Sequence, residues 1–165
     1  MGTSDKIKIF LVDDDKMFTE SLKHALEEER TEIKTFPTGE ECLKSLGKDD
    51  PKIIVLDYYL NSNCAFAMNG IQILNKIKQS NPDTEVIMLS SQDNINVAVD
   101  TMKYGAYDYI TKGESAAVKI KSTVKHICDS MEQVDNFDKE KSRLKKINIA
   151  IVVLVILAYI LTRIL

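Results

Sequence analysis

Apolar runs of strand length alternate with amphipathic stretches over most of this chain. Five short runs rich in Ile, Val and Leu end near residues 12, 36, 57, 89 and 110. A continuous apolar run bounded by turn residues is typical of a strand buried on both faces of a parallel sheet. Between these runs, apolar residues recur every three or four positions, which predicts helices with one buried face. The alternation therefore predicts an α/β fold with helices on both faces of a parallel sheet.

The same pattern gives boundaries for the elements. The predicted strands are Ile7–Val12, Ile33–Phe36, Ile53–Asp57, Thr84–Leu89 and Tyr107–Ile110. The predicted helices are Lys16–Arg30, a second one capped by Thr38 and ended by Gly47, Gly70–Lys78, Asn94–Tyr104 with a left-handed Gly105 after it, and a last one from about Glu114.

Polar residues follow four of the five strands directly. Asp13 and Asp14 follow the first strand, Asp57 ends the third, Ser90 follows the fourth and Lys112 the fifth. Open α/β folds bind ligands at this edge of the sheet. If the first and third strands are neighbours, three carboxylates converge, and carboxylates about 5 Å apart repel by roughly 3 kcal/mol per pair at an effective dielectric near 20. Such a cluster needs a cation, and oxygen ligands favour Mg²⁺ or Mn²⁺ over zinc.

A phosphoryl donor suits the same place, because a metal and a lysine would spread its charge. The Asp57 carboxylate would then be a nucleophile that forms an acyl phosphate. Lys112 would pair with the phosphoryl group and Ser90 would hydrogen-bond it. Taken singly, the acids after the first strand could merely cap the following helix, and Lys112 could merely be exposed. The joint pattern is far more specific than any of its parts.

Five segments carry a resemblance to a known family: Ile9–Asp15, Ile53–Asp57, Asn69-Gly70, Val86–Ser91 and Tyr104–Lys112. Over residues 5–131 the chain resembles the receiver domain of two-component response regulators. The resemblance implies a flavodoxin-like (βα)5 doubly wound parallel sheet with strand order 2-1-3-4-5.

The resemblance also implies residue roles. Asp57 would accept phosphate from a histidine kinase or phosphotransfer protein, and Asp13, Asp14 and the Tyr59 backbone carbonyl would help bind Mg²⁺. Ser90 would be the switch hydroxyl and Tyr109 the aromatic that turns behind it. Phosphorylation would change the surface of helix four, strand five and helix five. Such a domain is a phosphoacceptor in a phosphorelay and no enzyme beyond its own phosphorylation and dephosphorylation.

The chain departs from the family pattern in two places. Gly113 follows Lys112 where the family usually has a proline, which leaves the placement of the lysine open. The loop Leu60–Asn69 is about five residues longer than the common pattern, and its insertion, Ser62–Met68, would be a lid, a partner surface or simply a tolerated surface insertion. Tyr59 and Gln92 occupy positions that tune dephosphorylation in the family.

The last 19 residues form an apolar run. As a helix, 147–165 would be roughly 28 Å long, which predicts a single-pass transmembrane anchor. The alternative is a buried helix or an oligomer core. Lysines and arginine in the charged helical linker 132–146 would place the receiver on the cytoplasmic face of the cell (inner) membrane, with the lipid bilayer as a partner.

The last helix also carries an apolar stripe, Ile120, Val124, Ile127, Met131 and Val134, spaced by four and three residues. The stripe would pack on the sheet, or it would continue towards Phe137 and Leu144 as a stalk that pairs with a second copy. Homodimers are thus expected through helix four, strand five and helix five or through the stalk.

Composition narrows the function further. A net charge of −3 gives no reason to expect nucleic acid, and three widely spaced cysteines indicate neither a disulfide framework nor a zinc site. The sequence predicts a membrane-tethered, stand-alone receiver. The rivals are a receiver scaffold that never uses phosphate, and a haloacid-dehalogenase-like phosphatase suggested by Asp13-x-Asp15.

Overall fold

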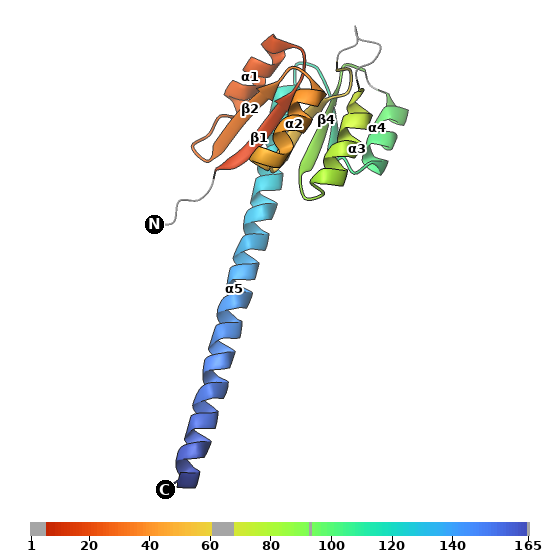
Figure 1. Cartoon of the computed structure of the whole chain (residues 1–165). Helices are drawn as coiled ribbons and strands as arrows, with labels where there is room; N and C mark the ends of the chain where they lie inside the picture. Colours follow the sequence, from red (N-terminus) through yellow and green to blue (C-terminus); the bar gives the residue numbers. More distant parts are fainter. Residues whose placement is uncertain (1–5, 61–67, 93, 165) are drawn as a thin grey trace. The chain divides into compact units, whose positions relative to one another are not determined.

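Five parallel strands alternate with five helices along the chain, as the apolar pattern predicts (Figure 1). The computed structural model describes residues 6–60, 68–92 and 94–164, with side chains beyond Leu154 described only for Ile156. The elements are β1 (Ile7–Val12), α1 (Lys16–Leu26), β2 (Thr31–Phe36), α2 (Gly39–Asp49), β3 (Ile53–Asp57), α3 (Gly70–Ser80), β4 (Glu85–Ser90), α4 (Ile95–Lys103), β5 (Asp108–Thr111) and α5 (Ala116–Ile164). The chain divides into two units, Met1–Val124 and Lys125–Leu165.

The strand order is β2-β1-β3-β4-β5, which confirms the expected order of the doubly wound sheet. The register aligns the carboxyl ends of the strands. Val12 lies beside Leu56, Asp57 beside Leu89, and Ser90 beside Thr111. Because the strands are parallel and in step, the polar residues that follow them come out at one edge of the sheet.

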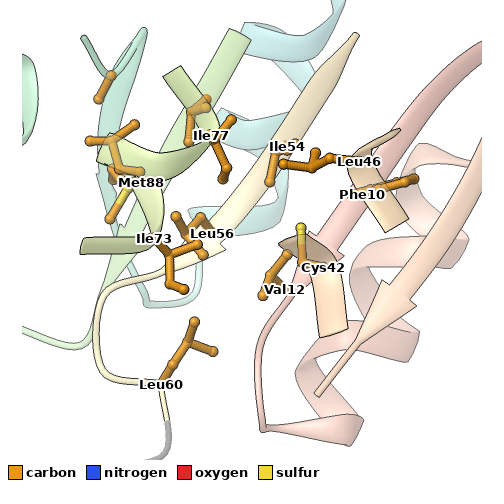
Figure 2. Close-up of a cluster of buried hydrophobic side chains, with 13 residues drawn as sticks. Phe10, Val12, Cys42, Leu46, Ile54, Leu56, Leu60, Ile73, Ile77 and Met88 are labelled. Atoms are coloured by element: carbon orange, nitrogen blue, oxygen red, sulfur yellow. The ribbon is translucent and has the colours of Figure 1, made fainter. Parts of the chain in front are cut away.

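The central strands β1, β3 and β4 are buried on both faces of the sheet, and their successive residues point to opposite faces. Figure 2 shows one face, where strand residues such as Phe10, Leu56 and Met88 meet Cys42 of α2 and Ile73 of α3. The intervening strand residues are equally buried and point to the opposite face. Buried side chains of α1 and of the first turns of α5 belong to this second layer: Leu22, Leu26, Ala116, Ile120 and Val124.

The ends of α1 and α2 differ from those expected, each for a local reason. α1 ends at Leu26, not Arg30, because the Thr31 hydroxyl donates to the carbonyls of Leu26 and Glu28 and accepts from the Glu28 N–H. These bonds turn the chain into β2. α2 passes through Gly47 and ends at Asp49, since Asp50 adopts the left-handed conformation (φ 43°) and donates its N–H to the Leu46 carbonyl. Thr38 caps α2, as predicted.

The prediction of a transmembrane anchor over 147–165, and with it a location at the membrane, is wrong. In the part of the chain that the structure describes, no helix combines the length and the apolar character that crossing a membrane requires. The apolar side chains described here, from Ile147 to Leu154 and at Ile156, continue directly from a charged segment of α5. The side chains of 155 and 157–165 lie outside the described residues.

Candidate functional site

Residues at the carboxyl ends of β1, β3 and β5 meet at the edge of the sheet. The Lys112 Nζ lies 2.7 Å from Asp13 Oδ2 and 3.1 Å from Asp57 Oδ2. Both carboxylates are almost wholly buried, at 5% and 2% exposed. The lysine reaches them although Gly113 follows it, because its backbone N–H is fixed by a 2.7 Å hydrogen bond to the Ser90 carbonyl. Strand pairing therefore positions Lys112 without the proline that is usual at the next position.

Burial and the neighbouring charges both shift the pKa values of Asp57 and Lys112. Burial raises the pKa of Asp57, the neighbouring Asp13 charge raises it further, and Lys112 lowers it without cancelling the rise. Burial by itself would lower the pKa of Lys112, but the hydrogen bond and charges of Asp13 and Asp57 outweigh it and raise that pKa. The ammonium therefore stays charged, while the Asp57 carboxylate is held at a cost in free energy.

Three carboxylates are close enough to share one cation. Oxygens of Asp13, Asp14 and Asp57 all lie within 4.8 Å of one another, and Asp14 is exposed. The Oδ1 atom of Asp57 is buried and has no hydrogen-bond partner in the part of the chain described here. A buried carboxylate oxygen with no partner is costly, and a hard cation would satisfy it. The set of oxygen donors fits Mg²⁺ or Mn²⁺, whereas the position of the Tyr59 carbonyl as a further ligand remains a prediction.

The third acid of the run has a different role. Asp15 caps α1, since its Oδ1 accepts the N–H groups of Met17 and Phe18 at 3.0 and 3.1 Å. This carboxylate therefore turns to the helix, and the pair of acids that a haloacid-dehalogenase site requires is not formed at Asp13-x-Asp15. Phe18 of α1 places its ring 5.2 Å from the Lys112 Nζ, a contact that the sequence did not predict. An aromatic face at this distance attracts the ammonium.

Gln92 is the centre of the polar contacts beside the acids. Its backbone carbonyl accepts both the Ser90 hydroxyl (3.1 Å) and the Tyr109 hydroxyl (2.8 Å). Its side-chain Oε1 accepts the Tyr59 hydroxyl at 3.0 Å, which joins the loops after β3 and β4. The sequence identified Ser90, Tyr109 and Tyr59 separately. It gave no sign that one residue holds all three, because that depends on the path of the chain after β4.

Gly70, the first residue of α3, packs tightly against the backbone next to Asp57. A Cβ at Gly70 would lie 2.6 Å from the Tyr58 Cα and 2.7 Å from the Asp57 carbonyl oxygen, so only glycine fits there. Just before it, the Met68 N–H donates to Glu40 Oε1 of α2 at 3.1 Å. Apart from Met68, the predicted insertion Ser62–Met68 lies outside the described residues.

Fold and site together define a flavodoxin-like α/β protein with an acidic, lysine-bearing pocket at the carboxyl edge of its sheet. The profile described as "Response regulator receiver domain" matches residues 9–125. The chain belongs to this family of signalling domains, which confirms the resemblance.

Among its relatives, the nitrogen assimilation regulatory protein NtrX of Azorhizobium caulinodans is 32% identical over 104 residues, which are 63% of this chain and 22% of NtrX. The transcriptional regulatory protein TrcR of Mycobacterium tuberculosis is 30% identical over 106 residues, 64% of this chain and 39% of TrcR. The crystal structure of the NtrX receiver domain from Brucella abortus is 26% identical, with a TM-score of 0.65 over 73% of this chain and 97% of that one. The chain thus spans well under half the length of these two relatives and nearly the whole of an isolated receiver domain.

Proposed function

We propose that this receiver takes a phosphoryl group on Asp57 from a histidine kinase or phosphotransfer protein and signals through the conformational change that follows. The observation that carries the proposal is the unequal state of the two Asp57 oxygens. Oδ2 is held by Lys112, whereas Oδ1 is buried and without a hydrogen-bond partner among the described residues. This carboxylate is fixed in place and still has lone pairs available for an incoming electrophile.

The residues present fit a divalent cation held by Asp13, Asp14 and Asp57. When bound, Mg²⁺ would neutralise the acids and the charge on the phosphoryl oxygens. The chain's own contribution is positioning and charge. Lys112 lies within hydrogen-bond distance of two acids, so a phosphoryl group on Asp57 would come within its reach.

The transfer itself is a simple displacement. A carboxylate oxygen of Asp57 attacks the phosphorus, the P–N bond to the donor histidine breaks, and the imidazole nitrogen keeps the electron pair and takes up a proton. The product is an acyl phosphate on Asp57. Because its added oxygens carry negative charge, they compete with the Gln92 carbonyl for the Ser90 hydroxyl.

A switch follows from the bond that Ser90 would then give up. Ser90 and Tyr109 both donate to the Gln92 carbonyl, so movement of Ser90 towards the phosphoryl group disturbs the acceptor that Tyr109 uses. Tyr109 packs at the border of the hydrophobic core cluster, where its ring has apolar neighbours on the inner side. Rotation of this ring would carry the signal to the surface of β5 and its neighbouring helices.

The test is phosphorylation with a small donor, acetyl phosphate, in the presence of Mg²⁺. We expect the wild-type protein to gain one hydroxylamine-sensitive phosphoryl group, detected by intact mass. Asp57→Asn should gain none, and excess chelator should abolish labelling of the wild type. Asp83→Asn, which neutralises an exposed acid away from the site, is the matched control and should label normally. Equal labelling of the Asp57 variant would refute Asp57 as the acceptor, and a wild type that gains no label would leave a phosphate-independent scaffold as the function.

A further inference from the structure

As far as Lys146, the second unit of the chain presents an apolar stripe and a polar face on the same helix, and beyond Lys146 exposed apolar side chains such as Ile147 and Ile149 surround the stripe. Val134, Phe137, Leu144 and Ile151 of α5 are between 53% and 68% exposed. Their spacing of three or seven residues places them in one line along the helix. The residues around the other side are charged or polar as far as Lys146: Asp135, Asn136, Lys139, Ser142, Arg143 and Lys146. An exposed apolar line opposite a polar face is typical of a helix that pairs.

The stripe fits a heptad with defined core positions. With Val134 at a and Phe137 at d, the following core positions are Lys141, Leu144, Asn148 and Ile151. Leu144 and Ile151 are d residues, as is typical of a paired seam. Lys141 and Asn148 fall at a, where a polar residue fixes register and oligomeric state in parallel pairs at a cost in stability.

The charged residues at the e and g positions beside the stripe indicate which partner binds it. Glu140 falls at g and Lys145 at the following e position. In a parallel, in-register pair, a g residue of one helix faces the next e residue of the other, so Glu140 would meet the Lys145 of a second copy, twice by symmetry. The stripe from Val134 to Ile151 would be roughly 27 Å long, two and a half heptads. Opposite charges at these positions favour a second copy of this chain over an unrelated partner.

We propose that two copies of this protein associate through a parallel, in-register coiled coil over 134–151. This pairing is independent of the phosphorylation chemistry. It differs from association through the receiver, where α4 exposes its own apolar line of Ile95, Val99 and Met102. The coiled coil would keep two receivers together before and after phosphorylation.

Charge reversal on the full chain tests the pairing. The wild type should sediment as a dimer, and Glu140→Lys and Lys145→Glu should each weaken association about fivefold or more, because each creates two like-charge pairs. The double variant should return to within about twofold of the wild type. Lys139→Glu, on the outer f position, makes the same charge change as Lys145→Glu and should have no effect. A monomeric wild type, or a double variant no better than the single ones, overturns the proposal.

A crosslink tests orientation and register. In a background where Cys64 and Cys128 are serine and the buried Cys42 is retained, Leu144→Cys should form a disulfide between copies, because d residues face each other. Arg143→Cys, one residue earlier on the outer face, should not. Equal crosslinking of both, or of neither, overturns parallel in-register pairing. Labelling of Asp57 in every variant reports separately whether the receiver is intact. If association is instead lost in the double variant Ile95→Ser/Val99→Ser, the copies pair through the α4 surface, and the coiled-coil proposal is overturned.

Discussion

Removal of the Lys112 ammonium is the sharpest perturbation that the site offers. Lys112→Met keeps the length of the side chain and its packing beside Phe18, but it leaves Asp13 and Asp57 facing each other without a cation. At an effective dielectric near 20, each ion pair at 2.7 or 3.1 Å is worth about 5–6 kcal/mol before desolvation, and two carboxylate oxygens within 4.8 Å of each other repel by at least about 3.5 kcal/mol. Desolvation of the lysine offsets much of the gross gain.

We therefore expect Lys112→Met to lower the free energy of unfolding by about 3 kcal/mol in chelator, near the lower end for loss of one partner of a buried ion pair. Urea unfolding followed by circular dichroism measures this difference. Combining it with Asp57→Asn should recover most of the loss, because a single carboxylate then remains beside the methionine. Mg²⁺ should also recover part of the loss, since it replaces the missing positive charge.

Lys34→Met is the matched control for this experiment. Lys34 makes an ion pair of 2.6 Å with Asp49, but the lysine side chain is 38% exposed. Water screens such a pair, so its loss should cost under about 1 kcal/mol. If Lys112→Met in chelator unfolds at the same urea concentration as this control, the carboxylates do not depend on the lysine and the proposed electrostatics of the site are wrong.

Three further outcomes are expected. Gly70→Ala should destabilise the protein by about 2 kcal/mol or more in urea unfolding, because its Cβ would clash with backbone, whereas Gly47→Ala, which meets nothing within 4 Å, should be neutral or stabilising by up to about 1 kcal/mol. Tyr59→Phe should shorten the lifetime of the labelled phosphate about threefold, since it removes the hydrogen bond to Gln92, and an unchanged decay rate would show that the bond does not restrict water. In metal-free buffer, the wild type should lose stability relative to Asp57→Asn as pH rises above 3.8, because the folded state with its raised pKa holds a proton longer than the unfolded state; a constant difference across pH would contradict the raised pKa.

The sheet and the meeting of the site residues follow from simple features of the sequence. The central apolar runs can be buried on both sides only within a parallel sheet, and four of the five runs lead into the acids, the hydroxyl or the lysine of the site. Parallel pairing then aligns these ends without any further information. This is why Asp13, Asp57 and Lys112 could be expected together before their distances were known.

Local hydrogen bonds decided the features that the sequence pattern missed. The end of α1 depends on the Thr31 hydroxyl, which competes with the helix for backbone partners. The membrane prediction failed on a different ground. It rested on the apolar residues of 147–165, whereas no helix in the described part of the chain is long and apolar enough to cross a membrane.

Gln92 contributes to two properties through different groups. Its side chain bears on the phosphate lifetime, and its backbone carbonyl bears on the coupling between Ser90 and Tyr109. Its carbonyl oxygen accepts the hydroxyls of Ser90 and Tyr109, and its side-chain oxygen accepts the hydroxyl of Tyr59. A carbonyl offers two lone pairs, and both are used in this structure. Substitution of Gln92 by alanine removes the side-chain bond and leaves the carbonyl in place, so it should change the phosphate lifetime and spare the coupling between Ser90 and Tyr109. Tyr109→Phe should do the reverse, because it frees one lone pair of the carbonyl and leaves the bridge to Tyr59 intact.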